Sequence, residues 1–60
     1  MERLLTIDQL SEILQVRKNT LYSWVFSRKI PHIKIGGLLR FQEKEISKWI
    51  DAQVKENRNL

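Results

Sequence analysis

The polar side chains of residues 17–23 are of the types that contact a nucleic acid. Asparagine can pair with the edge of adenine, a cation can reach guanine or a phosphate, and hydroxyl groups suit backbone oxygens. The candidate contacts of this stretch are Arg17, Lys18, Asn19, Thr20, Tyr22 and Ser23. A structural role is open for two of them, because Asn19 can instead cap a helix locally and Tyr22 can cover the edge of a core.

A second set of candidates follows between residues 28 and 40. A pair of glycines stands between two cations, which is typical of a basic hairpin, or wing, whose expected contacts are Lys34, Gly36, Gly37 and Arg40. The further candidates for phosphate contacts are Arg28, Lys29 and His32. Lys29 can equally complement a helix dipole. His32 is the single histidine and the chain has no cysteine, so we expect no metal site.

The positive charge is concentrated in the middle of the chain. The whole chain carries a formal net charge of +4. Residues 17–41 hold six cations and no acid, whereas residues 1–16 hold one arginine against three acids, and residues 42–60 cancel. A solvated face is the common fate of surface charge, but ordinary surfaces mix signs. A block of one sign therefore favours an anionic partner, nucleic acid above all.

Length and composition exclude several classes of protein. A chain of 60 residues is one small domain that rarely builds an enzyme's pocket, and no cluster of carboxylates or activated nucleophile is visible, so we expect no catalytic residues, cofactor or small-molecule substrate. No apolar run approaches a membrane span, and the first residues do not resemble a signal peptide. We expect a cytoplasmic, nucleoid-associated protein.

Two helices must position the first set of candidates. Thr6 and Gln9 have the spacing of a capping box, and Leu5 and Leu10 that of a hydrophobic staple. The apolar stripe of this first helix is expected to comprise Leu10, Ile13 and Leu14. A second helix is predicted from about Lys18 to Ser27, and its inward stripe is Leu21, Trp24 and Val25. About three residues separate the two predicted helices, and one of them, Val16, is apolar and expected to pack between the helices. Two helices joined by so short a turn predict a helix-turn-helix.

A hairpin and a third helix complete the predicted order of helix, helix, hairpin, helix around one core. We expect a three-residue loop of Gly36, Gly37 and Leu38, which places Ile35 opposite Leu39 and Ile33 opposite Phe41. The four apolar side chains then share one face of the hairpin, which we expect to pack on the helices, and Lys34 opposes Arg40 on the other face. The third helix is expected from Gln42 to about Val54 or a little further, with Ile46, Trp49 and Ile50 inward. Residues 55–60 are expected as a flexible tail outside a core of about 4–54, and this tail is a candidate partner-binding segment.

Phe26 has no role in this scheme. The helical wheel places it on the outward face of the second helix. A second copy of the chain, a thymine methyl group and the wing are all open as its contact.

Several short motifs in this order resemble the excisionase-type helix-turn-helix family. They are Leu4–Leu10, Val16, Thr20–Tyr22, Lys29–Pro31, Ile33–Gly37, Arg40–Phe41 and Ile46–Ile50. The resemblance implies a winged helix-turn-helix fold, mainly α with a small β-hairpin, related to the DNA-binding domain of MerR-type regulators. It departs at Gln15, where members often have glycine, and at Arg17, where they often have a serine that caps the recognition helix.

The resemblance also implies a function. Such proteins bind DNA through the second helix and the wing. Some are excisionases, which bend attachment-site DNA and steer an integrase toward excision, and the AlpA-like members are small transcriptional regulators. We therefore expect a non-enzymatic, sequence-specific binder of double-stranded DNA with an excisionase-like architectural role, assisted by an integrase or by further copies of itself. The alternatives are an AlpA-like regulator and, more remotely, an adaptor that docks an acidic protein.

Overall fold

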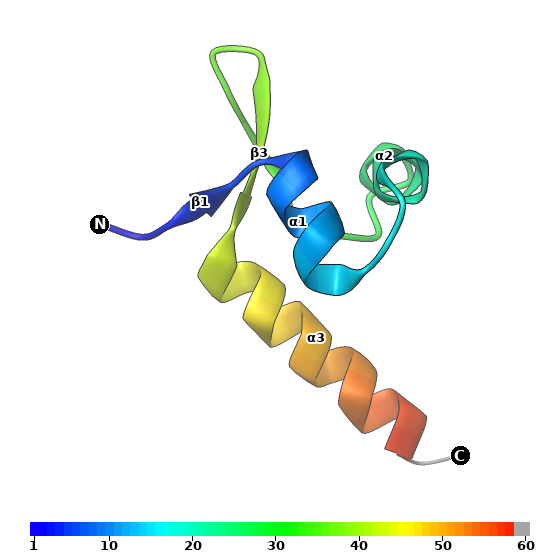
Figure 1. The fold of residues 1–60 in the computed structure, drawn as a ribbon. Helices are drawn as coiled ribbons and strands as arrows, with labels where there is room; N and C mark the ends of the chain where they lie inside the picture. Colours follow the sequence, from blue (N-terminus) through cyan, green and yellow to red (C-terminus); the bar gives the residue numbers. More distant parts are fainter. Residues whose placement is uncertain (59–60) are drawn as a thin grey trace.

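The computed structural model describes residues 1–58, which form three helices and three short strands. The elements are β1 (Leu4–Leu5), α1 (Ile7–Leu14), α2 (Lys18–Phe26), β2 (Ile33–Ile35), β3 (Leu38–Gln42) and α3 (Glu43–Arg58). The strands form an antiparallel sheet in the order β1-β3-β2. The β2–β3 hairpin projects away from the helices as a wing, and α3 extends in the opposite direction (Figure 1). This is the predicted winged helix-turn-helix fold.

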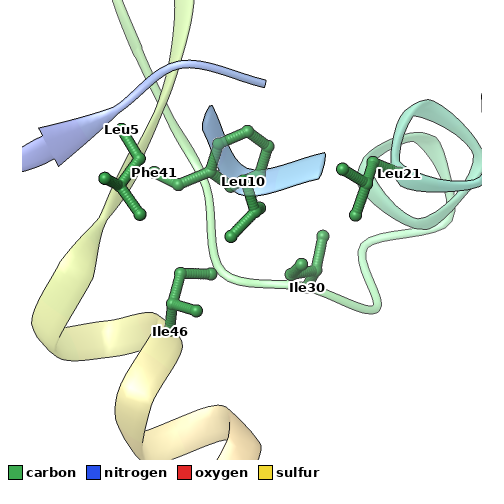
Figure 2. Close-up of a cluster of buried hydrophobic side chains, with 6 residues drawn as sticks. All are labelled: Leu5, Leu10, Leu21, Ile30, Phe41 and Ile46. Atoms are coloured by element: carbon green, nitrogen blue, oxygen red, sulfur yellow. The ribbon is translucent and has the colours of Figure 1, made fainter. Parts of the chain in front are cut away.

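A single core holds the elements together, and the wing contributes little to it. The buried residues are Leu5, Leu10, Leu21, Ile30, Phe41 and Ile46, each no more than 3% exposed (Figure 2). Every element except β2 supplies one of them, and Ile30 comes from the segment after α2. Because β2 has no buried residue, packing does not constrain the outer part of the hairpin.

Helix α1 begins as predicted and differs at one apolar position. The Thr6 hydroxyl accepts a hydrogen bond from the Gln9 backbone N–H at 3.1 Å, and the Thr6 backbone N–H donates to Gln9 Oε1 at 2.9 Å, so the capping box is confirmed. Leu10 and Leu14 pack in or against the core, whereas Ile13 is 55% exposed. The expected three-residue stripe was wrong at Ile13, because the packed stripe is Ile7, Leu10 and Leu14, and Ile13 lies about 100° around the helix from Leu14.

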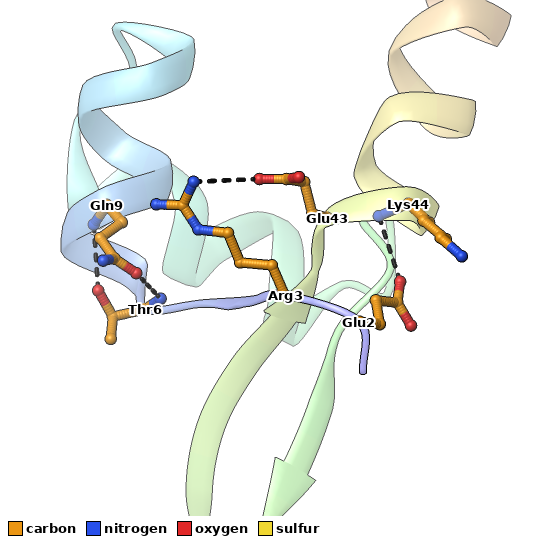
Figure 3. Close-up of polar contacts among 6 residues, drawn as sticks. All are labelled: Glu2, Arg3, Thr6, Gln9, Glu43 and Lys44. Carbon is orange, nitrogen blue, oxygen red and sulfur yellow. Dashed lines mark hydrogen bonds and ion pairs between the residues drawn. The ribbon is translucent and has the colours of Figure 1, made fainter.

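The strand β1 was not predicted, since two residues are too short for an alternating pattern. Leu5 pairs with Phe41 of β3, and the residues just before β1 cap the start of α3 (Figure 3). The Glu43 N–H donates to the Arg3 carbonyl at 3.1 Å, and the Lys44 N–H donates to Glu2 Oε1 at 3.2 Å. The chain's first residues therefore satisfy backbone donors of a helix about forty residues later.

Helix α3 begins at Glu43, because Gln42 is the last residue of β3, and it runs about one turn beyond Val54, to Arg58. Residues 55–58 are helical and exposed. The last two residues of the expected flexible tail, 59 and 60, lie outside the described part of the chain.

The predicted register of the hairpin was wrong. Ile35 pairs with Leu38, Lys34 with Leu39, and Ile33 with Arg40, so the loop is the two glycines alone. Gly36 and Gly37 have φ values of +57° and +84°, the pair of positive angles that a tight two-residue hairpin turn requires. Burial of an apolar face was expected to set the register, but Ile35 and Leu38 are 49% and 59% exposed. Without that constraint, the turn geometry decides.

Candidate nucleic-acid interface

Helix α2 presents one polar face to solvent. Leu21 is fully buried, and Trp24 and Val25 pack against the core, which confirms the predicted inward stripe. The side chains on the exposed part of the helix are Lys18, Asn19, Thr20, Tyr22, Ser23 and Phe26. The core contacts therefore orient the predicted α2 candidates outward together.

The start of α2 carries two cations and no side-chain cap. Arg17 occupies the N-cap position with φ −63° and ψ 144°, and its side chain makes no capping hydrogen bond. Lys18 Nζ lies 2.7 Å from Asp8 Oδ1 of α1. The hydrogen bond to Asp8, followed by the charge of that carboxylate, raises the pKa of the Lys18 ammonium above its ordinary value of 10.5. Lys18 thus stays charged and is held at the end of α2 nearest α1.

Two residues in the left-handed conformation bracket α2. Gln15 has φ 57° and Arg28 has φ 56°, values at which a side chain costs about 1–2 kcal/mol. Gln15 ends α1, and its side-chain Nε2 donates to the Glu12 carbonyl at 2.7 Å. Arg28 follows the end of α2, where its left-handed backbone turns the chain toward the wing. At both positions glycine would fit the backbone with less strain.

The C-terminal end of α2 is fastened to α3. The Trp49 indole N–H donates to the Lys29 carbonyl at 3.0 Å, and the rings of Trp24 and Trp49 lie 5.8 Å apart between centroids. The Lys29 N–H donates in turn to the Trp24 carbonyl at 2.8 Å. These contacts use the backbone of Lys29 and leave its side chain exposed. These contacts therefore join the C-terminal end of α2 directly to α3.

A broad open groove of about 1370 Å³ separates α2 from the wing. Residues of α2 form one wall, and residues of the following segment and the hairpin form the other. The lining residues are Asn19, Tyr22, Ser23, Val25, Phe26, Arg28, Ile30, Pro31, His32, Ile33, Lys34, Gly37 and Leu39. The groove thus gathers predicted candidates from both sets, and no acidic side chain lines it.

His32 lies half-buried in this groove with a defined orientation. Its Nδ1 is 2.8 Å from the Ile30 carbonyl oxygen. A carbonyl oxygen can only accept, so Nδ1 carries the proton, and Nε2 of the neutral ring is an acceptor. A contact of His32 with a phosphate therefore requires protonation at Nε2.

The two wing cations lie on opposite faces of the hairpin, which corrects the predicted Lys34–Arg40 pair. Lys34 pairs with Leu39, and Arg40 pairs with Ile33, so the alternation of side chains separates them. Lys34 and Leu39 line the groove that faces α2. Arg40 shares the opposite face with Ile33 and does not itself line the groove, and its Nη1 donates to the Leu39 carbonyl at 2.7 Å.

Comparison with known families agrees with this geometry. The helix-turn-helix domain family, a DNA-binding family, matches the chain over residues 4–54. The chain belongs to this family. No curated protein and no solved structure gives a significant match. The match begins at β1 and ends within α3, so it contains the whole interface of this helix-turn-helix domain.

Two further structural observations concern the described residues of the helix-turn-helix domain. No helix within residues 1–58 is long and apolar enough to cross a bilayer. In the same residues, no three side chains of histidine, cysteine, aspartate or glutamate are grouped so that they could hold a metal ion.

Asp8 was not among the predicted site residues, although it pairs with one of them, Lys18. Its position in the first turn of α1 gives no sign of a partner in α2. The ion pair joins it to a residue ten positions later in another helix, and no local pattern signals such a contact. The angle between the two helices, which the turn at Gln15 and Val16 sets, brings the two charges together.

Proposed function

We propose that this helix-turn-helix domain is a non-enzymatic, sequence-specific binder of double-stranded DNA. The observation that carries the proposal is the acid-free groove flanked by the exposed face of α2 and by the wing. Helix α2 enters the major groove, where base edges present distinct donor and acceptor patterns. The groove between α2 and the wing then straddles the phosphate strand that separates the major groove from the adjacent minor groove, with the exposed residues of α2 on the major-groove side.

The positions of the wing cations suggest how the hairpin is used. With Lys34 on the α2 side and Arg40 on the other, a hairpin set edge-on in the minor groove has a cation for each of the two phosphate strands that border it. Arg28, Lys29 and, when protonated, His32 add contacts along the strand in the groove. Gly36 and Gly37 at the tip carry no side chain that would hinder close approach.

Salt dependence and paired substitutions test the proposal. A duplex selected from a random pool supplies the binding site. If roughly four to six phosphates are contacted, log K falls with log[salt] at a slope of about −4 to −5. Asn19→Ala relaxes preference at one base pair by about 1–3 kcal/mol, whereas Lys34→Ala weakens binding to all sequences alike and lowers the slope by about one.

Lys48→Ala is the matched control, because Lys48 is an exposed cation of α3 that pairs with Glu45 outside the groove. It should leave both affinity and slope unchanged. The proposal would be overturned if the affinity for DNA did not depend on salt concentration, or if the chain did not bind DNA at low salt. Capture of an acidic protein in place of DNA would instead support an adaptor.

Within DNA binding, we infer an excisionase-like architectural role, with an AlpA-like transcriptional regulator as the alternative. One such module buries only about 600–1,000 Å² of its own surface, so tight binding calls for further copies on adjacent sites or for an integrase. The resemblance of the sequence supports this role. A search of the neighbouring genes for an integrase, followed by an excision assay with that integrase, tests it. Unchanged excision together with altered promoter activity would favour the regulator.

A further inference from the structure

We propose that Phe26 is a specificity-determining residue that contacts the 5-methyl group of thymine, and this inference rests on the proposed DNA binding. Phe26 is the last residue of α2, and its side chain is 91% exposed. A ring this exposed packs neither on the core nor on the wing, although it lines the groove between α2 and the wing. The fold therefore gives Phe26 no structural use.

The position of Phe26 on the helix places it with the polar side chains. It follows Tyr22 by four residues and Ser23 by three, so the three lie on the same face of α2. The nine residues of α2 span about 13 Å, close to the roughly 12 Å width of the major groove. A helix whose first residues meet base edges therefore still has its last residue inside the groove.

The chemistry of the major groove then selects the contact. The hydrogen-bonding groups of the base edges there are polar, and the methyl group of thymine is the one apolar group that projects into the groove. The Phe26 ring has no polar atom. A polar base edge against it would lose hydrogen bonds to water without replacement, whereas a methyl group loses none.

Charge argues against a second copy of this chain as the occupant. The groove that contains Phe26 is also lined by Arg28 and Lys34, and no acid lies among residues 17–41. Two such surfaces meeting face to face would repel each other, while DNA brings the opposite charge. The apolar ring on a cationic surface thus suits an anionic partner that carries apolar groups, as thymine-containing DNA does.

The experiment removes the two partners of the proposed contact separately, the methyl group of thymine and the ring of Phe26. Each thymine of the selected duplex is replaced in turn by deoxyuridine, which lacks only the methyl group. We expect one or two positions at which wild-type affinity falls by about fourfold, the change that corresponds to burial of one CH₂-sized group. At these positions Phe26→Ala should lose affinity on the thymine duplex but show less than about a twofold difference between thymine and deoxyuridine.

The controls separate this inference from the proposed function. Val54→Ala truncates another exposed apolar side chain, on α3, and should keep the full sensitivity to deoxyuridine. Since Phe26 is exposed, Phe26→Ala should melt as the wild type does. Equal sensitivity of wild type and Phe26→Ala to deoxyuridine would overturn the thymine contact while leaving DNA binding intact. The thymine contact would also be overturned if the wild type sediments as a dimer without DNA and Phe26→Ala sediments as a monomer. If the wild type binds no duplex at all, the proposed function itself is overturned.

Discussion

Helices α1 and α2 are neighbours of similar length, yet they begin in opposite ways. At α1, Thr6 and Gln9 cap each other's backbone donors (Figure 3). Asp8 also places a negative charge in the first turn of α1. At α2, Arg17 offers no capping side chain, the first turn has no acid, and Lys18 adds a second cation. The start of α1 therefore has three stabilising interactions, and the start of α2 has none within its own residues.

The difference shows where stability and binding have been placed in this domain. Cations at a helix N-terminus oppose the helix dipole and leave backbone N–H groups without a side-chain partner. The same cations and free N–H groups suit a phosphate. Asp8 of the well-capped helix compensates the poorly capped one by pairing with Lys18 at 2.7 Å. Local rules are obeyed where the chain only folds and are broken where it is proposed to bind, as expected for functional sites.

Breaking the capped start should have the largest effect on stability. Thr6→Ala removes the hydroxyl that accepts the Gln9 N–H and should lower the free energy of unfolding by about 1 kcal/mol, within a range of roughly 0.5–2. In a domain of this size, that loss lowers Tm by about 4–8 °C in thermal unfolding followed by circular dichroism. Thr20→Ala, an exposed threonine within α2, is the control and should not lower Tm. If both variants melt with the wild type, the cap is not a source of stability.

A capping residue at the start of α2 should raise the stability of the domain and lower its affinity for DNA. Arg17→Ser supplies a capping hydroxyl and removes a cation from the helix N-terminus, so the free energy of unfolding should rise by about 0.5–1 kcal/mol. DNA affinity should fall, and the salt slope should become shallower by about one. Arg17→Ala removes the same cation without adding a cap, so it should share the loss of affinity and gain less stability. Equal melting of the two variants would contradict the role assigned to the missing cap.

Breaking the ion pair between Asp8 and Lys18 should have the smallest effect on the free energy of unfolding, and this effect should change at alkaline pH. Because the folded-state pKa of Lys18 is raised above 10.5, its stabilisation is complete below that pH and is lost as pH rises through the folded pKa. Urea unfolding of wild type and Asp8→Asn should differ by a constant amount between about pH 7 and 10, and the difference should shrink above that range. Glu12→Gln, which removes the other acid of α1, should show no such trend. A difference that does not change with pH would assign the effect of Asp8 to the dipole of α1 alone.

Much of the site could be predicted from the sequence because its signals are local. The spacing of Thr6 and Gln9 is enough to predict the first cap, and the spacing of Leu21, Trp24 and Val25 is enough to orient α2. Orienting α2 also places Asn19, Tyr22 and Ser23 outward together. The absence of acids in residues 17–41 is a property of composition that no fold can change.

The wing shows where local reasoning failed. A buried face was assumed to choose the register, but β2 has no residue in the core, so Gly36 and Gly37 chose it instead. That shift of register moved Arg40 to the face opposite Lys34 and changed how the hairpin can meet a duplex. A pattern of alternation predicts register only where one face of the strand is buried.

The sequence by itself determined the two helix starts, the inward face of α2 and the concentration of positive charge, because each depends on residues within one or two helical turns or on composition alone. Only the tertiary structure decided the pairing of Asp8 with Lys18, the capping of α3 by Glu2 and Arg3, and the separation of the wing cations. It also left Phe26 unpacked beside the groove. Each of these depends on the angles at which elements pack, and those angles are set by the shared core around Phe41 and Leu10.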